Sequence, residues 1–335
     1  MALTVLALRA LGLGDALTAV PALKGLRRGM PGARLVLAAP PEVGGWLRSL
    51  GLVDDVLPTQ GRAAPPDRLA WPAGAQPPDL AVNLHGRGPQ SHRLLRALQP
   101  GRLVAFECAE AGFHDGPRWE EDEHEVDRWC RLVRSAGGGC GREDLVIADV
   151  GVEPGLSATA AGVASSPVIP SPAVVHPGAA SPARRWPAER WAGVVSGLSA
   201  RGLPVVVTGT PAEGALCAEA ASAGGLDLSG RLSLEELAQT VATASVVLCG
   251  DTGVAHLATA LRRPSVILFG PTSPAHWGPA VDEDLHRVLW HEDVPTSGDP
   301  HATVTDPRLQ AITVAEVLQA VDGLGVRPAQ RFPHP

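Results

Sequence analysis

The sequence contains no tyrosine, and Lys24 is its only lysine; all other basic side chains are arginines. With 38 glycines and 32 prolines, this composition indicates the codon bias of a GC-rich genome. An arginine in this chain is therefore weaker evidence of specific anion recognition than it would be elsewhere. The 335 residues carry a formal net charge of −7, which argues against nucleic acid as the main partner.

Cysteine is scarce, and the sequence has no CxxC pair and no metal-ligand spacing among its five cysteines (Cys108, Cys130, Cys140, Cys217 and Cys249). We therefore expect reduced thiols in a cytoplasmic protein. The apolar N-terminus has no basic region, and Arg9 and Asp15 interrupt it, so it is a poor signal peptide. Because no stretch approaches ~18 uninterrupted apolar residues, we expect at most peripheral contact with a membrane.

The length corresponds to about two domains. Residues 148–172 are rich in small residues and almost uncharged, which indicates a linker. We expect an N-terminal domain over residues 1–150, a linker over 151–172 and a C-terminal domain over 173–325. Both halves alternate short apolar strands with helical patterns, and this predicts two parallel, doubly wound α/β domains. Ligands bind beyond the carboxyl ends of the strands in such sheets, so the loops there are the candidate sites.

The first such loop has the sequence GLGD at residues 12–15. Leu17 stands at the third glycine position of a GxGxxG fingerprint, which disfavours a dehydrogenase. Asp15 either caps the following helix or acts as a general base at the mouth of a cleft. The helix contains Pro21, so it either begins near Thr18 or is kinked.

The second loop, HPGAASPARRWP at residues 176–187, lies between a predicted strand and a predicted helix. Arg184 and Arg185 come just before Pro187, where free backbone N–H groups and the helix dipole attract anions. Two cations at this position suit a diphosphate. The alternative is a charge pair exposed to solvent.

The third loop, CGDTGVAH at residues 249–256, runs from an apolar strand into a helix. Thr252 is either a simple N-cap, or its amide and that of Gly253 form a phosphate cradle together with the imidazole of His256. A structural role for His256 is the alternative.

A fourth loop, at residues 269–279, is stiffened by proline and presents Thr272 and Trp277, unless it is only a well-packed turn. Two further motifs carry little weight. Residues 282–284 spell DED, but no strand leads into them, so a metal-binding DxD motif is not expected. Residues 124–127 (HEVD) lack the second histidine of HExxH and are interpreted as a helix surface.

Taken together, five stretches resemble glycosyltransferase family 9, the ADP-heptose:lipopolysaccharide heptosyltransferase family: LRALGLGDALTAVPALKGLRR, LHGRGPQS, VVHPGAASPARRWPAERW, GDTGVAHLATAL and LFGPTSPAHWGP. They occur in the family's order. The resemblance implies a GT-B fold, in which two Rossmann-like domains face each other and the C-terminal domain holds most of the nucleotide sugar. It also implies inverting transfer without a metal or other cofactor.

By the same resemblance, Asp15 is the general base and Glu213 binds the ribose hydroxyls. Arg184 stands where the family commonly has lysine, which keeps the charge and changes the donor geometry. The residues expected around the diphosphate and sugar are Gly14, Ser181, Arg184, Asp251, Thr252, Gly253 and His256.

The expected function is an inverting, metal-independent glycosyltransferase. It would move a heptose or related sugar from a nucleotide-sugar donor, ADP-linked, to a hydroxyl of a glycan, glycolipid or small-molecule acceptor. Residues 107–123 are acidic where lipopolysaccharide heptosyltransferases carry basic residues, which argues against a lipopolysaccharide acceptor. Two alternatives remain. A nucleotide-sugar epimerase or hydrolase would need a second catalytic acid, and Asp15 argues against a non-catalytic nucleotide-sugar-binding protein.

Overall fold

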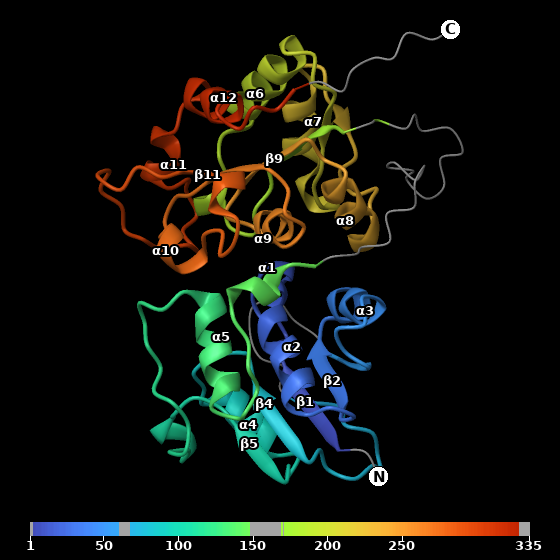
Figure 1. Ribbon diagram of the computed structural model, residues 1–335. Helices are drawn as coiled ribbons and strands as arrows, with labels where there is room; N and C mark the ends of the chain where they lie inside the picture. Colours follow the sequence, from blue (N-terminus) through green and yellow to red (C-terminus); the bar gives the residue numbers. More distant parts are fainter. Residues whose placement is uncertain (1–2, 60–67, 148–168, 170, 328–335) are drawn as a thin grey trace, which may run out of the picture. The chain divides into compact units, whose positions relative to one another are not determined.

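The computed structural model forms two compact units, Met1–Leu145 and Val146–Pro335 (Figure 1). The residues described are 3–59, 68–147, 169 and 171–327. Each unit is built on one parallel sheet, as the alternation of strands and helices predicts. The predicted linker, residues 151–172, lies almost wholly outside the described residues and stays a prediction.

The sheet of the first unit has the strand order β3-β2-β1-β4-β5. Leu95 of α4 packs on the face that carries Leu6. Helix α3 packs on the other face, where a Cβ at Gly44 would lie 2.6 Å from the Val56 side chain. The described elements of this unit are β1 (Thr4–Leu8), α1 (Leu13–Thr18), α2 (Val20–Gly29), β2 (Arg34–Ala39), α3 (Pro41–Ser49), β3 (Asp55–Pro58), β4 (Leu80–Asn83), α4 (Gln90–Arg96), β5 (Arg102–Val104), η1 (Ala109–Ala111), α5 (Glu125–Arg134) and η2 (Arg142–Leu145).

The helical segment after β1 is broken in two at Ala19, which separates α1 from α2 and leaves Pro21 in the first turn of α2. Pro21 thus lies in the first turn of a helix that begins at Val20, close to Thr18, and the short helix α1 precedes it. This agrees with the first alternative, because proline is tolerated where its missing N–H has no intrahelical acceptor to lose. The capping interpretation of Asp15 is wrong. Gly12 is the N-cap of α1, with an extended backbone at φ −70° and ψ 178°, and no side chain caps this helix.

The sheet of the second unit has the order β11-β10-β9-β6-β7-β8. Among the described residues of the chain, no helix is long and apolar enough to cross a membrane. The described elements are β6 (Ala173–His176), η3 (Pro182–Arg184), α6 (Ala188–Ala200), β7 (Val205–Val207), η4 (Pro211–Glu213), α7 (Gly214–Ala221), β8 (Leu226–Asp227), α8 (Leu234–Ala242), β9 (Val246–Gly250), α9 (Gly253–Ala260), β10 (Ser265–Leu268), α10 (Pro274–Trp277), η5 (Glu283–Leu285), β11 (His286–Leu289), α11 (Pro307–Ala311) and α12 (Val314–Asp322).

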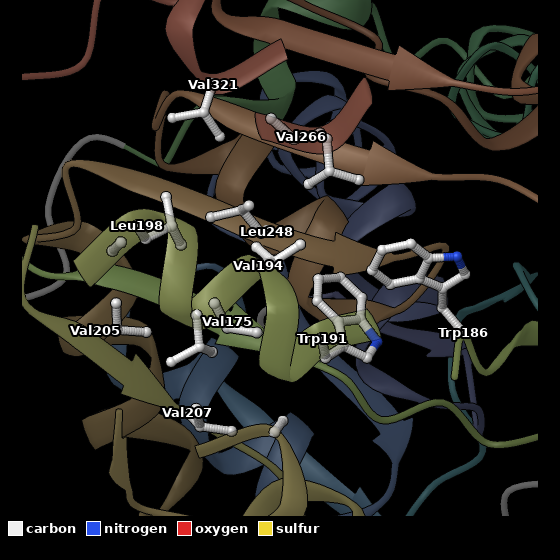
Figure 2. Close-up of a cluster of buried hydrophobic side chains, with 14 of the residues drawn as sticks. Val175, Trp186, Trp191, Val194, Leu198, Val205, Val207, Leu248, Val266 and Val321 are labelled. Atoms are coloured by element: carbon white, nitrogen blue, oxygen red, sulfur yellow. The ribbon is translucent and has the colours of Figure 1, made fainter. Parts of the chain in front are cut away.

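The core of this unit fixes the end of the loop that follows β6 (Figure 2). Val175 and Leu248 of neighbouring strands belong to the same buried cluster as Val194 of α6. The rings of Trp186 and Trp191 meet edge to face, with centroids 5.0 Å apart. Trp186 ends the loop between β6 and α6 and is 1% exposed, so that loop is anchored by a large buried side chain.

Each sheet has one point at which the chain reverses its direction of travel across the sheet. In the first unit this point lies between β1 and β4, and in the second between β6 and β9. Loops leaving two such strands diverge, and open parallel sheets bind their ligands in the crevice between them. The GLGD loop follows β1, and the HPGAASPARRWP and DTG loops follow β6 and β9. The topology therefore puts three of the predicted loops at the ligand-binding edges of the two sheets.

Candidate functional site

Helix α9 begins at Gly253, with two residues between it and the end of β9, and its first turn lacks a side-chain cap. Thr252 is the N-cap residue, with φ −145° and ψ 173°, but its hydroxyl makes no capping hydrogen bond, and the first turn has no acidic residue. The simple capping role of Thr252 is therefore wrong. The first N–H groups of a helix have no intrahelical acceptors, and together with the helix dipole they favour an anion.

Arg184 lies beside this helix start. Its Nη1 is 3.4 Å from the backbone oxygen of Asp251 and 4.0 Å from Asp251 Oδ2. Asp251 Oδ2 also accepts a hydrogen bond of 2.6 Å from Thr272 Oγ1. Asp251 thus joins the loops that follow β6, β9 and β10. The prediction that Arg184 binds an anion at the start of α6 is corrected, because its guanidinium lies beside Asp251 at the end of β9.

Hydrogen bonds within the second unit fix the rest of the loop at residues 176–187. Arg185 Nε donates to the Ala179 oxygen at 2.8 Å, so this side chain is tied to its own loop, and its pairing with Arg184 on a diphosphate stays a prediction. Ser181 is buried, and its hydroxyl donates to the Ala302 oxygen at 3.2 Å. Ala183 N donates to the same oxygen at 3.2 Å. These bonds fix the backbone that carries Arg184.

Glu213 and His176 form a second polar group at the same edge of the sheet. The backbone N–H and the side-chain hydroxyl of Thr210 both donate to Glu213 Oε2, each at 2.8 Å. His176 Nδ1 lies 3.0 Å from Thr208 Oγ1, and burial lowers the pKa of His176 although the Glu213 carboxylate opposes this. A Cβ at Gly178 would lie 2.3 Å from the Glu213 carboxyl group. The glycine of the HPG sequence therefore lets the carboxylate reach the loop after β6.

His256 lies on α9 and is nearly buried, with 8% of its surface exposed. Its ring packs edge to face against Trp277 of α10, with centroids 6.0 Å apart. Both residues predicted to matter in the fourth loop make contacts at this edge. Thr272 donates a hydrogen bond to Asp251, and Trp277 packs against His256. The fourth loop is therefore packed against the residues at this edge of the sheet, and a direct role of Thr272 and Trp277 toward a ligand stays a prediction.

In the first unit, Asp15 is held by a buried arginine. Arg9 is 2% exposed, and its Nε donates to the Asp15 backbone oxygen at 2.8 Å. Its Nη2 lies 3.3 Å from Asp15 Oδ1. The Asp15 side chain remains 32% exposed. The carboxylate is therefore oriented from inside the unit and still accessible from outside, as a general base must be. Gly14 lies next to it, in the first turn of α1.

Glu125 completes this group, and the sequence interpretation missed it. Arg9 Nη2 donates to Glu125 Oε1 at 3.0 Å, and Trp129 Nε1 donates to the same oxygen at 2.9 Å. Arg128 pairs with the other oxygen, Oε2. The interpretation of the HEVD stretch as a helix surface is wrong for this residue, because Glu125 is 5% exposed. Arg9 was the available signal, since a charge directly after an apolar strand needs a buried partner.

The acidic stretch at residues 282–284 serves local structure. Asp282 accepts hydrogen bonds of 2.8 and 3.0 Å from Arg262. Within the part of the chain that the structure describes, no cluster of three or more His, Cys, Asp or Glu side chains is placed to hold a metal ion.

The model of glycosyltransferase family 9 (heptosyltransferase) matches residues 115–299, which is more than half of the chain. The chain belongs to glycosyltransferase family 9. It is thus a glycosyltransferase, as expected. The matched range includes every predicted site residue of the second unit and excludes Gly14 and Asp15. Comparison with curated protein sequences finds no match.

Solved structures of this family share the fold. The chain is similar to E. coli ADP-heptose lps heptosyltransferase II, with 20% identity, 96% of this chain and 98% of that chain covered, and a TM-score of 0.73. A glycosyl transferase family 9 structure from Veillonella parvula matches with 17% identity, 96% of each chain and a TM-score of 0.71. E. coli heptosyltransferase WaaC with ADP matches with 19% identity, 96% and 99% coverage, and a TM-score of 0.66. The predicted GT-B fold is confirmed.

Proposed function

We propose that this family 9 member transfers a heptose or a related sugar from an ADP-linked donor to a hydroxyl of a glycan, glycolipid or small-molecule acceptor. The observation that carries the proposal is the start of α9, which has no side-chain cap and lies beside Arg184 at the β6/β9 edge. Similar structures contain ADP or an ADP-heptose analogue, as the WaaC structures do. An anion site at this edge suits the diphosphate of such a donor.

Donor binding falls to the second unit in this proposal. Arg184 and the amides of Thr252 and Gly253 contact the diphosphate, and Glu213 accepts hydrogen bonds from the ribose hydroxyls. Ser181, Asp251 and His256 shape the same edge. The diphosphate gains negative charge as its bond to the sugar breaks, so preorganised donors there lower the barrier as well as bind the substrate.

Asp15 supplies the base, with Gly14 beside it. An acceptor hydroxyl is a weak nucleophile until its proton is removed. Its oxygen attacks the anomeric carbon on the face opposite the diphosphate, the proton passes to the Asp15 carboxylate, and the bond between the sugar and the diphosphate breaks. One displacement of this kind inverts the anomeric centre.

We propose that the leaving diphosphate is stabilised by Arg184 and the amides at the start of α9, and that transfer needs no metal or other cofactor. All five cysteines are buried and unpaired, which suits a reducing compartment, and we propose a cytoplasmic location.

The test is an assay of nucleoside diphosphate release from ADP-, GDP- and UDP-sugars, with and without cell-derived acceptors and EDTA. The proposal predicts release from an ADP-sugar that requires an acceptor and persists in EDTA. Release without any acceptor would indicate a hydrolase, and release that stops in EDTA and returns with a divalent metal would overturn metal independence.

A further inference from the structure

We infer that His85 binds the acceptor, and that its ring Nε2–H donates a hydrogen bond to a hydroxyl oxygen of an uncharged, sugar-like molecule. His85 belongs to the HGRG sequence directly after β4, which the chemistry above does not use. The inference rests on the proposed glycosyl transfer and narrows its acceptor class.

His85 lies at the ligand-binding edge of the first sheet. Strands β1 and β4 are parallel neighbours, so the loops that carry Asp15 and His85 leave the sheet side by side. One buried side chain ties the two loops together, because Arg9 donates to the Leu84 oxygen at 2.7 Å and to the Asp15 oxygen at 2.8 Å. A group on His85 is therefore held at the edge that presents the proposed base.

The hydrogen bond from Ala10 selects one tautomer of the His85 ring. The Ala10 amide donates to His85 Nδ1 at 3.2 Å. A backbone amide can only donate, so Nδ1 carries a lone pair and the proton of the neutral ring is on Nε2. Burial, together with the charge of Arg9, lowers the pKa of His85 to about 4, so the ring is neutral near pH 7. Within the described part of the chain, Nε2 has no hydrogen-bond partner, and the residue is partly exposed.

The loop holds this donor in one orientation before any ligand arrives. His85 N donates to Asn83 Oδ1 at 3.2 Å, and Asn83 Nδ2 donates to the Gly86 oxygen at 3.2 Å and to Ser91 Oγ at 2.9 Å. Asn83 is fully buried. A Cβ at Gly86 would meet no atom within 4 Å, so the space beside His85 is open. A preset donor beside open space suits a bound ligand.

The surrounding charges favour an uncharged acceptor. Arg9 is paired with Asp15 and Glu125, and Arg87 of the same loop is 2.5 Å from Glu121. A phosphorylated acceptor would bring a negative charge that an available cation would have to balance, as Arg184 does for the proposed donor. With both arginines paired to carboxylates, a neutral N–H donor matches a hydroxyl oxygen.

The test measures the binding of two sets of probes to the full chain by saturation-transfer NMR. The probes are methyl hexopyranosides and the corresponding hexose 6-phosphates. We expect the uncharged glycosides to bind the wild type more tightly than the phosphates do. His85→Ala should weaken glycoside binding about 3- to 10-fold, the effect of one hydrogen bond. His85→Gln should restore it, since Gln offers both an acceptor and an N–H donor. His114→Ala, at an exposed histidine of the same unit, is the control.

Ring ¹⁵N spectra test the tautomer directly, and we expect a neutral His85 protonated at Nε2 from pH 8 to pH 6. A ring protonated at Nδ1, unchanged binding by His85→Ala, preference for the phosphates, or no glycoside binding by the wild type would each overturn the inference. Different results would contradict the proposed transferase activity and the role of His85. His85-dependent glycoside binding without sugar transfer would contradict that activity alone, and transfer unaffected by His85→Ala would contradict the role of His85 alone.

Discussion

Arg184 is the residue on which the proposed donor site depends most clearly. A charge-assisted hydrogen bond is worth ~1.5–3 kcal/mol, so we expect Arg184→Ala to weaken ADP binding about 10- to 100-fold. Arg184→Lys should retain most of the affinity because the charge is kept. Titration calorimetry measures both variants. The control is Arg201→Ala, which removes an ion pair with Asp322 at the far end of α6. Equal ADP affinity in Arg184→Ala and wild type would remove Arg184 from the site.

The residues found by motif and those found only in the structure differ in a physical way. Arg184 and Asp251 stand in loops after strands, and chain order alone places such loops at one edge of a sheet. Glu125 is separated from Arg9 by 116 positions, and only the packing of α5 brings their side chains to 3.0 Å. Arg9 indicates that a buried carboxylate partner exists, but the sequence pattern of a short amphipathic helix does not tell which charged residue turns inward, so the partner could not be identified as Glu125.

At the level of elements, the strands of the second unit were predictable because their valine-rich runs are buried on both faces. Helix α8 begins with a capping box formed by Ser233 and Glu236, whose spacing is recognisable in the sequence itself. Strand β8 contains only two residues and β11 is partly exposed, so neither has a distinct apolar run, and neither was predicted. The order of the elements along the chain does not predict which loops come into contact, such as the loop that carries Gly178 and the one that carries Glu213.

A substitution at Gly178 tests this contact with Glu213. In Gly178→Ala, the new Cβ would displace the Glu213 carboxyl group, which now lies 2.3 Å from its position. We expect ADP affinity to fall about tenfold through lost hydrogen bonds to the ribose, and affinity for inorganic pyrophosphate to stay unchanged. Gly214→Ala is the matched control, since a Cβ there meets nothing within 4 Å. Calorimetry with both ligands decides. A parallel loss of ADP and pyrophosphate would contradict the ribose role of Glu213.

For the whole molecule, the proposed function assigns donor binding to the second unit and the general base to the first. The second unit carries the family match over most of its described length and holds Arg184, Glu213 and the start of α9. The first unit holds Asp15 and His85, which lie outside that match. The acidic segment at residues 107–123 is largely paired with arginines, for example Glu107 with Arg118 and Glu121 with Arg87. Its net charge thus overstates the negative surface offered to an acceptor.

The most direct test of this division is Asp15→Asn, measured for ADP binding and for sugar transfer in the same preparation. The substitution keeps the shape and an oxygen for Arg9 but removes the base. We predict ADP affinity within about twofold of wild type and a transfer rate lower by about 10²- to 10⁴-fold. Asp79→Asn, at an exposed aspartate beside the opposite end of β4, should leave both unchanged. Transfer at the wild-type rate in Asp15→Asn, or loss of ADP binding with it, would contradict the account.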